Sequence, residues 1–248
     1  MVVERFGGVT IVKRDEVRRA PGCWYVQGSR MLHDLDDRTV EAMARASTTA
    51  SYATGELLHE AGQPMDAVAF ISRGRVKVYR LSRDGKQQTI ALLGPGDAFG
   101  EIGIVDRAAQ DLYIEALEDT SICRTTRDAF LQLASRDPAL AIRLAEGMGE
   151  KLQEARERIA AFAFRDIRGR VAHLLVTFLD RERRLTDDSG RDRIEPGLTH
   201  RELADIIGTR RESVTLALSS LERDGLIRIQ DHAIVFPNVA ALREIAEA

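Results

Sequence analysis

Cysteine and long apolar runs are scarce in this sequence of 248 residues. Its two cysteines, Cys23 and Cys123, cannot build a disulfide framework, and neither belongs to a C-x-x-C pair with metal-ligand spacing. No apolar run approaches the roughly 18 residues that a membrane span needs, and the start lacks a basic segment followed by an apolar one. These absences predict a protein of the reducing cytoplasm, with no membrane partner and no metal site.

Positive charge is limited as well. The formal net charge is -3, and lysine fills only four of the 36 basic positions, so arginine supplies nearly all cations. From Asp166 onward, 13 arginines face 15 acidic residues, a net charge of -2. Such a protein does not bind polyanions through bulk charge. Any contact with nucleic acid must therefore be local, and we expect dimerisation to strengthen it.

Signatures of catalysis are missing too. The sequence contains no nucleophile elbow, no P-loop, no dinucleotide-binding glycine fingerprint and no paired histidine ligands. We therefore predict no catalytic residues and a protein that is not an enzyme.

Two domains are expected, because one domain usually needs roughly 100 to 200 residues. Residues 1–27 show no sustained period and are predicted to be an N-terminal extension. Residues 28–136 begin with an amphipathic helix predicted from Leu32 to Ala46 and continue as short β-type runs with regularly spaced glycines, which is typical of a β-barrel or roll. Asp84-Gly85 predicts a hairpin, because both central positions of such a turn take positive φ.

A long helix is predicted over residues 137–165, with Asp137 as N-cap and Pro138 at the first helical position. Its apolar stripe is spaced by fours and threes, as in a coiled-coil seam. The stripe comprises Leu140, Leu144, Met148, Leu152, Ala155, Ile159 and Phe162. It either packs on the same chain's roll or meets a second copy. About 40 Å of helix is too long for one small roll to cover, so we expect a homodimer.

A helix-turn-helix is predicted inside a last domain at 166–248, which Asp166 opens as a helix N-cap. Thr199 and Glu202 form a capping box that starts the first helix, expected to end near residue 206. Gly208 then permits a sharp turn, and the second helix is predicted over about 210–223.

The first residues of the second helix are those that reach base edges in a DNA major groove. Arg211 can donate two hydrogen bonds to one guanine. Glu212 can accept a hydrogen bond from a cytosine amine, unless it forms a second capping box with Thr209. The start of the first helix favours phosphate contacts. The candidate DNA-binding residues are Thr199, His200, Arg201, Arg210, Arg211, Glu212, Ser213 and Thr215.

Two polar connections complete this domain. The segment from Arg181 to Gly197 is predicted to be a solvated connection or hairpin. The β-type runs LIRI and AIVF flank Gln230-Asp231-His232 and predict a hairpin beside the helix pair, hence a winged arrangement. Its Arg228 or His232 would lie along the phosphate backbone.

The order of roll, long helix and winged helix-turn-helix resembles the cyclic-AMP receptor protein (CRP/FNR) family of bacterial transcription regulators, over roughly Leu32 to Pro237. The similar pieces are GELLHEAGQPMDAVAFISRGRVKVYR, GPGDAFGEIGI, FRDIRGRVA and LTHRELADIIGTRRESV. The resemblance implies an α+β fold and a homodimer formed through residues 137–165. It also implies a TGTGA-like palindromic DNA site and contact with RNA polymerase, often through a surface such as the 181–197 connection.

The resemblance is weaker at the positions that bind the cyclic nucleotide in the relatives. In cyclic-nucleotide-binding relatives a Gly-Glu pair contacts the ribose, which Gly100 and Glu101 match. Gln110 and Asp111 stand where an arginine and a hydroxyl should neutralise the phosphate, and a carboxylate repels that phosphate. Arg107 is the candidate substitute from the same loop. The candidate effector-binding residues are therefore Gly100, Glu101, Arg107 and Gln110.

The helix position that would hold Thr-Ser for the purine is Ala155-Arg156. We therefore expect a regulator that does not depend tightly on cyclic AMP and has no certain cofactor. An iron-sulfur cluster needs about four cysteine ligands. The sequence has two cysteines, which excludes an iron-sulfur sensor of this kind. Haem binding through His59 is a further alternative, but we expect His59 to be an ordinary surface residue.

Leu216 replaces an arginine that is frequent among the relatives, so the half-site should be relaxed or changed at the base that it faces. Two alternatives stay open for the whole chain. One is a regulator activated by cyclic AMP or another small ligand. The other is a nucleotide-binding module that acts through protein partners.

Overall fold

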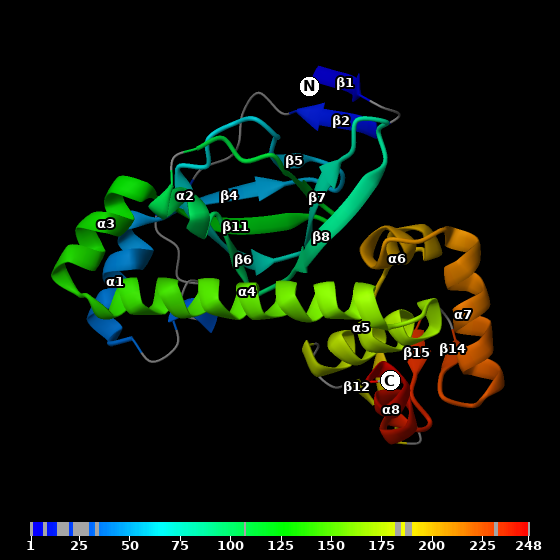
Figure 1. Ribbon diagram of the computed structural model, residues 1–248. Helices are drawn as coiled ribbons and strands as arrows, with labels where there is room; N and C mark the ends of the chain where they lie inside the picture. Colours follow the sequence, from blue (N-terminus) through cyan, green and yellow to red (C-terminus); the bar gives the residue numbers. More distant parts are fainter. Residues whose placement is uncertain are drawn as a thin grey trace. The chain divides into compact units, whose positions relative to one another are not determined.

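The chain forms two compact units, Met1–Leu152 and Gln153–Ala248, and their elements are shown in the computed structural model of Figure 1. The structure describes residues 2–6, 9–13, 20–21, 30–32, 35–106, 108–181, 185–186, 190–230 and 233–247. Within these ranges, no helix combines the length and the apolar composition of a membrane span.

The first unit is built on two antiparallel sheets. One contains, in spatial order, β3 (Ala20–Pro21), β4 (Thr48–Tyr52), β11 (Thr120–Thr126), β6 (Ala67–Arg73) and β9 (Ala98–Phe99). The other contains β5 (Leu57–His59), β10 (Tyr113–Ala116), β7 (Val76–Leu81) and β8 (Gln87–Leu93). Apolar side chains from both sheets, among them Ile71, Val78 and Ile114, form one buried cluster. The predicted β-roll is confirmed.

The predicted hairpin joins β7 and β8, which pair in antiparallel register from Val76↔Leu93 to Leu81↔Gln87. Its loop has three residues rather than two, because the Ser82 amide donates to the Lys86 carbonyl and Gly85 takes a φ of 75°. The left-handed residue at the end of a three-residue loop is a common solution for hairpins.

A second hairpin, of β1 (Val2–Phe6) and β2 (Val9–Lys13), lies within the segment that we expected to be an extension without regular structure. Cys23 lies outside the described residues. Cys123 is fully buried on β11 and is disulfide-bonded, not free.

The helical elements of the first unit are η2 (Arg30–Leu32), α1 (Asp37–Ala46), α2 (Glu101–Val105), α3 (Arg127–Arg136) and the start of α4 (Ala139–Phe164). The first predicted helix thus begins at residue 37 and not at Leu32. Asp36 is its N-cap and accepts from the Thr39 amide, whereas Leu32 belongs to the separate η2 turn. The predicted long helix is confirmed within two residues, and Asp137 accepts from the Ala139 amide at its start.

The apolar stripe of α4 divides into two parts. Leu140 and Leu144 are buried in the core that also contains Met43 and Phe130. The later members differ, because Leu152 is 55% and Ile159 67% exposed. Packing on the chain's own roll therefore accounts for the first half of the stripe only.

The second unit contains the rest of α4, α5 (Ile167–Arg181), α6 (His200–Ile207), α7 (Arg211–Arg223) and α8 (Val239–Glu247). Its sheet has the order β12 (Leu185–Thr186), β13 (Asp192–Ile194), β15 (Ala233–Val235) and β14 (Arg228–Gln230). The Asp166 carboxylate accepts from the Gly169 amide, so the predicted N-cap of α5 is confirmed. The 181–197 connection contains the β12–β13 hairpin, and β14 and β15 form the predicted hairpin after the helix pair.

Two glycines allow α2 to approach β6. Gly100 has a φ of 91°, and a Cβ placed there would lie 2.2 Å from the Ala67 carbonyl oxygen. A Cβ at Gly103 would lie 1.6 Å from the Met65 carbonyl oxygen. Both spacings are impossible for real atoms, so the FGEIG motif has a structural requirement for its glycines, whatever binds there.

We predict that Gly103→Ala lowers the free energy of unfolding by about 1 to 3 kcal/mol or more, because the backbone of Met65 must move. Gly149→Ala is the matched control, since it is also helical but has open space around its Cβ position. It should gain about 0.5 to 1 kcal/mol from helix propensity. Urea unfolding monitored by circular dichroism measures both changes, and equal effects of the two variants would contradict the packing argument.

Candidate nucleic-acid interface

The capping box at the start of α6 is formed as predicted. The Thr199 hydroxyl accepts from the Glu202 amide at 3.2 Å, and the Glu202 carboxylate accepts from the Thr199 amide at 2.7 Å. The reciprocal bonds satisfy two backbone donors that the helix start would otherwise leave free. His200 and Arg201 follow on the first turn, and Arg201 is exposed. This end of α6 thus carries a cation beside polarised amides, which suits a phosphate.

The turn between the helices depends on Gly208, which has a φ of 65° and forms the C-cap of α6. The Thr209 amide donates to the Ala204 carbonyl, and α7 then starts with Arg210 as an N-cap whose side chain makes no capping hydrogen bond. The alternative capping box of Thr209 with Glu212 is therefore not formed. Its absence leaves the Glu212 carboxylate exposed on the first turn of α7.

The helix α7 has one buried and one exposed face. Val214, Ala217, Leu218 and Leu221 are buried at helical spacing. The exposed positions of α7 are Arg211, Glu212, Thr215, Leu216, Ser219, Glu222 and Arg223, while Ser213 is half-buried. The buried face anchors α7 against α5 and α6, so the residues expected to meet base edges project from a fixed support.

The structure joins two of the candidate residues directly. His200 Nδ1 and the Thr215 hydroxyl lie 2.9 Å apart, and that hydroxyl also donates to the Arg211 carbonyl oxygen at 3.1 Å. These bonds tie the start of α6 to the second turn of α7. Sequence reasoning placed both residues at the interface but not in contact, since a spacing of 15 residues across a turn leaves no pattern to detect.

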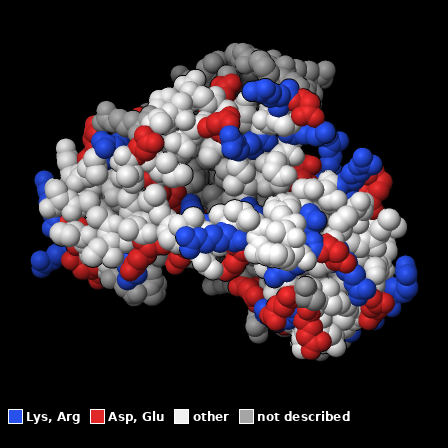
Figure 2. Space-filling view, viewed as in Figure 1, with Lys and Arg blue, Asp and Glu red and all other residues white. Residues whose placement is uncertain are grey.

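The β14–β15 hairpin, the predicted wing, is joined to α7 by a hydrogen bond. The Glu222 carboxylate of α7 accepts from the Ile229 amide of β14 at 3.1 Å, and Arg228 at the start of β14 is exposed. His232 lies outside the described residues. On the face that Figure 2 shows, blue and red side chains both occur among white ones around α6 and α7, and the blue ones form no broad patch there.

In the first unit, the carboxylate of Glu101 has an internal partner that the sequence did not reveal. Its side chain is 7% exposed, and its Oε1 lies 2.6 Å from Nζ of Lys151 on α4. The same ammonium donates to the Ala98 carbonyl oxygen at 2.7 Å. The acid that would bind a ribose is thus already paired with a cation of its own chain.

Of the other effector candidates, Gln110 is described and makes a contact within its own loop. The Gln110 side chain donates to the Ala108 carbonyl oxygen, and Asp111 pairs with Arg80 on the exposed side of β7. Arg107 lies outside the described residues. Ala155 and Arg156 are both exposed on α4.

His59 on β5 is half-buried, which differs from the surface position that we expected. Burial lowers its pKa below the ordinary value, a shift only partly opposed by the nearby Glu60. Its buried Nε2 makes no hydrogen bond. A cluster of three or more potential metal ligands is absent from the part of the chain that the structure describes.

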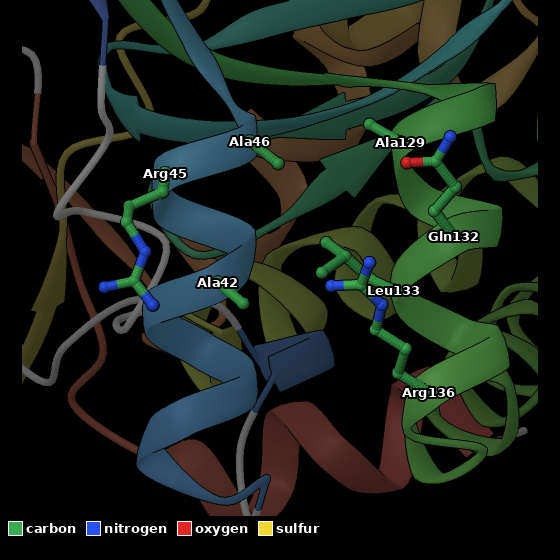
Figure 3. A pocket seen from close by; sticks show the side chains of 7 residues that line it. All are labelled: Ala42, Arg45, Ala46, Ala129, Gln132, Leu133 and Arg136. Carbon is green, nitrogen blue, oxygen red and sulfur yellow. The ribbon is translucent and has the colours of Figure 1, made fainter.

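A cavity of about 410 Å³ lies between α1 and α3. Figure 3 shows Ala42 and Ala46 turned toward α3, whereas Arg45 extends along the other side of α1. The remaining lining residues are Ala129, Gln132, Leu133 and Arg136. Gly100, Glu101 and Gln110, the candidate effector residues that the structure describes, do not line it.

Comparisons with known proteins match both units. The model of the cyclic nucleotide-binding domain matches residues 49–137, and that of the Crp-like helix-turn-helix domain matches residues 169–245. The Cyclic AMP receptor protein of Thermus thermophilus is 30% identical over 223 residues, covering 89% of this chain and 98% of its own. A cAMP-activated global transcriptional regulator of Mycobacterium tuberculosis is 25% identical, over 83% of this chain and 91% of its own.

The fold is similar to solved structures as well. FixK2 from Bradyrhizobium japonicum superposes with a TM-score of 0.72 at 26% identity, covering 82% of this chain and 98% of its own. TTHA1359, a CRP/FNR family transcriptional regulator from Thermus thermophilus, gives a TM-score of 0.66 at 27% identity, over 81% of this chain and 98% of its own.

We predict that Lys151→Met lowers the free energy of unfolding by about 1 to 3 kcal/mol, because it leaves the buried Glu101 carboxylate without its charged donor. Adding Glu101→Gln to that variant should recover part of the loss, since a neutral amide is cheaper to bury. A double-mutant cycle from urea unfolding measures the coupling. Strictly additive losses would mean that the two side chains do not stabilise one another.

Proposed function

Because the chain belongs to the CRP/FNR family of transcription regulators, we propose that it acts as a homodimer that binds a TGTGA-like palindrome without tight dependence on cyclic AMP. The carrying observation is the exposed start of α7, where Arg211 and Glu212 project from a helix anchored by its other face. The family's members are regulators and not enzymes, so the proposed activity is recognition of DNA.

In this proposal α7 lies in the major groove and α6 crosses the backbone. Arg211 donates to guanine O6 and N7, and Glu212 accepts from a cytosine amine. Arg201 at the start of α6 and Arg228 on the wing contact phosphates, which fix the register of the helix. Proteins of this kind act on the chromosome, so we place the activity in the cytoplasm.

Independence from cyclic AMP is supported by two features of the first unit. Gln110 and Asp111 provide no cation for a cyclic phosphate, and Asp111 is paired with Arg80. The ribose-type carboxylate, Glu101, is neutralised by Lys151 at 2.6 Å. A nucleotide entering this site must displace this ion pair, and the described loop residues Gln110 and Asp111 offer its phosphate no cation in exchange, so its binding is expected to be weak.

Homodimerisation is supported by the second half of α4. Leu152, Ile159 and Phe162 are 55%, 67% and 39% exposed, which is costly for large apolar side chains unless a partner covers them. A second α4 repeats the same stripe and can cover it in a two-fold arrangement. Two copies also present two α7 helices to the two halves of a palindrome. Contact with RNA polymerase is part of the proposal, through a surface such as residues 181–197.

We predict that Arg211→Ala weakens binding to the palindrome by about 1 to 3 kcal/mol and relaxes one base position, whereas Arg201→Ala weakens binding to all duplexes alike. Fluorescence anisotropy on the palindrome and on random duplex separates the two effects. Equal losses on both duplexes for Arg211→Ala would contradict its role at a base edge.

We predict that millimolar cyclic AMP changes the affinity for the palindrome less than twofold. Anisotropy with and without the nucleotide measures this, and calorimetry of the nucleotide with free protein is the companion measurement. A rise of tenfold or more would instead establish a regulator activated by cyclic AMP. Specific nucleotide binding without any duplex binding would favour a module that acts on protein partners.

We predict that Ile159→Glu converts the dimer to a monomer at micromolar concentration, because it places two charges in the apolar seam. Val105→Glu is the matched control, since Val105 is 65% exposed on α2 and not on α4. Sedimentation velocity distinguishes the species. A dimeric Ile159→Glu variant would remove the second half of α4 from the interface.

A further inference from the structure

We propose that Leu216 recognises the 5-methyl group of a thymine in each half-site of the DNA. This inference rests on the proposed function, because it requires α7 to lie in the major groove. Leu216 lies in the middle of α7 and is 72% exposed. The other large apolar side chains of this helix, Val214, Leu218 and Leu221, are buried. Leu216 is therefore the apolar member of an otherwise polar outer face.

The position of Leu216 follows from the helical repeat. Glu212, Leu216, Ser219 and Arg223 are all exposed and follow one another at intervals of four, three and four residues, so they form one stripe. One helical turn advances about 5.4 Å, and successive base pairs are about 3.4 Å apart. Leu216 therefore meets a base pair one or two steps from the pair that Glu212 reads.

The chemistry of the side chain selects its partner. Leucine has neither a donor nor an acceptor, so it cannot read guanine, cytosine or adenine by hydrogen bonds. Thymine displays a methyl group in the major groove, and apolar side chains read thymine through it. Contact between the two removes apolar surface of both from water, which supplies a preference for thymine over any base pair without the methyl.

Two features of the surrounding surface support this assignment. The neighbouring Thr215 hydroxyl is engaged by His200 and by the Arg211 carbonyl oxygen, so Thr215 is less available to read the same base. The other exposed large apolar side chains described in the second unit lie on α4 and on β14. Leu216 thus stands alone on α7, and a single side chain is too small to dock an apolar protein surface.

The test uses 2′-deoxyuridine, which lacks only the thymine methyl. Half-sites are first selected from a random duplex library with the full-length protein, and each selected thymine is then replaced singly by deoxyuridine. We expect one thymine at which the replacement weakens binding about fourfold per half-site, the contribution of one buried methyl-sized group. Leu216→Ala should show a similar loss on the thymine duplex and no further loss on the deoxyuridine duplex. Leu131→Ala, on α3 of the first unit, is the matched control and should leave every affinity unchanged.

The outcomes separate the two proposals. Specific binding that is indifferent to deoxyuridine at every thymine would overturn the role of Leu216 and leave the regulator intact. A loss for Leu216→Ala that is equal on thymine and deoxyuridine duplexes would likewise overturn it, because the side chain would then act elsewhere. If the library yields no preferred sequence, the sequence-specific function itself fails, and the methyl contact fails with it.

Discussion

The reversal of the chain at Gly208 is the constraint on which the candidate interface depends. A left-handed conformation costs an ordinary residue about 1 to 2 kcal/mol, and Gly208 adopts it with a φ of 65°. The turn brings the buried face of α6, with Leu203 and Ile207, to pack near that of α7. Burial of the apolar faces of both helices fixes the orientation of α7. Arg211, Glu212 and Leu216 therefore face solvent or a ligand.

A second interaction, the ion pair of Glu101 with Lys151, determines how the first unit can meet a ligand. In a site that depends on a nucleotide, the hydroxyl of the bound ribose is a hydrogen-bond partner of the buried carboxylate. Here Glu101 is satisfied by Lys151, so the chain itself supplies the partner that the carboxylate needs. The ion pair joins the first residue of α2 to α4, the helix whose later half carries the exposed apolar stripe. This pairing is one ground for our proposal that DNA binding does not depend tightly on cyclic AMP.

Much of the fold was predictable because its signals are local. Asp137, Asp166 and Thr199 start helices as their sequence context indicates, and the β-type runs form strands of the roll. The predicted start of the first helix was wrong, because the apolar residue Leu32 lies in η2 and not in α1. The apolar pattern also gave no signal for α3 and α8, whose short apolar periods are weak. The contacts of Lys151 with Glu101 and of His200 with Thr215 join residues distant in sequence, and neither spacing carries a pattern.

Binding of the purified, nucleotide-free protein to a fluorescent TGTGA-type palindrome, compared with a scrambled duplex of equal length, tests the central claim most directly. The account predicts a preference of at least a thousandfold for the palindrome at physiological salt, of the order found for sequence-specific regulators. It also predicts that the affinity falls steeply as salt is raised. Equal affinity for the two duplexes, or no binding to either without a nucleotide, would contradict it.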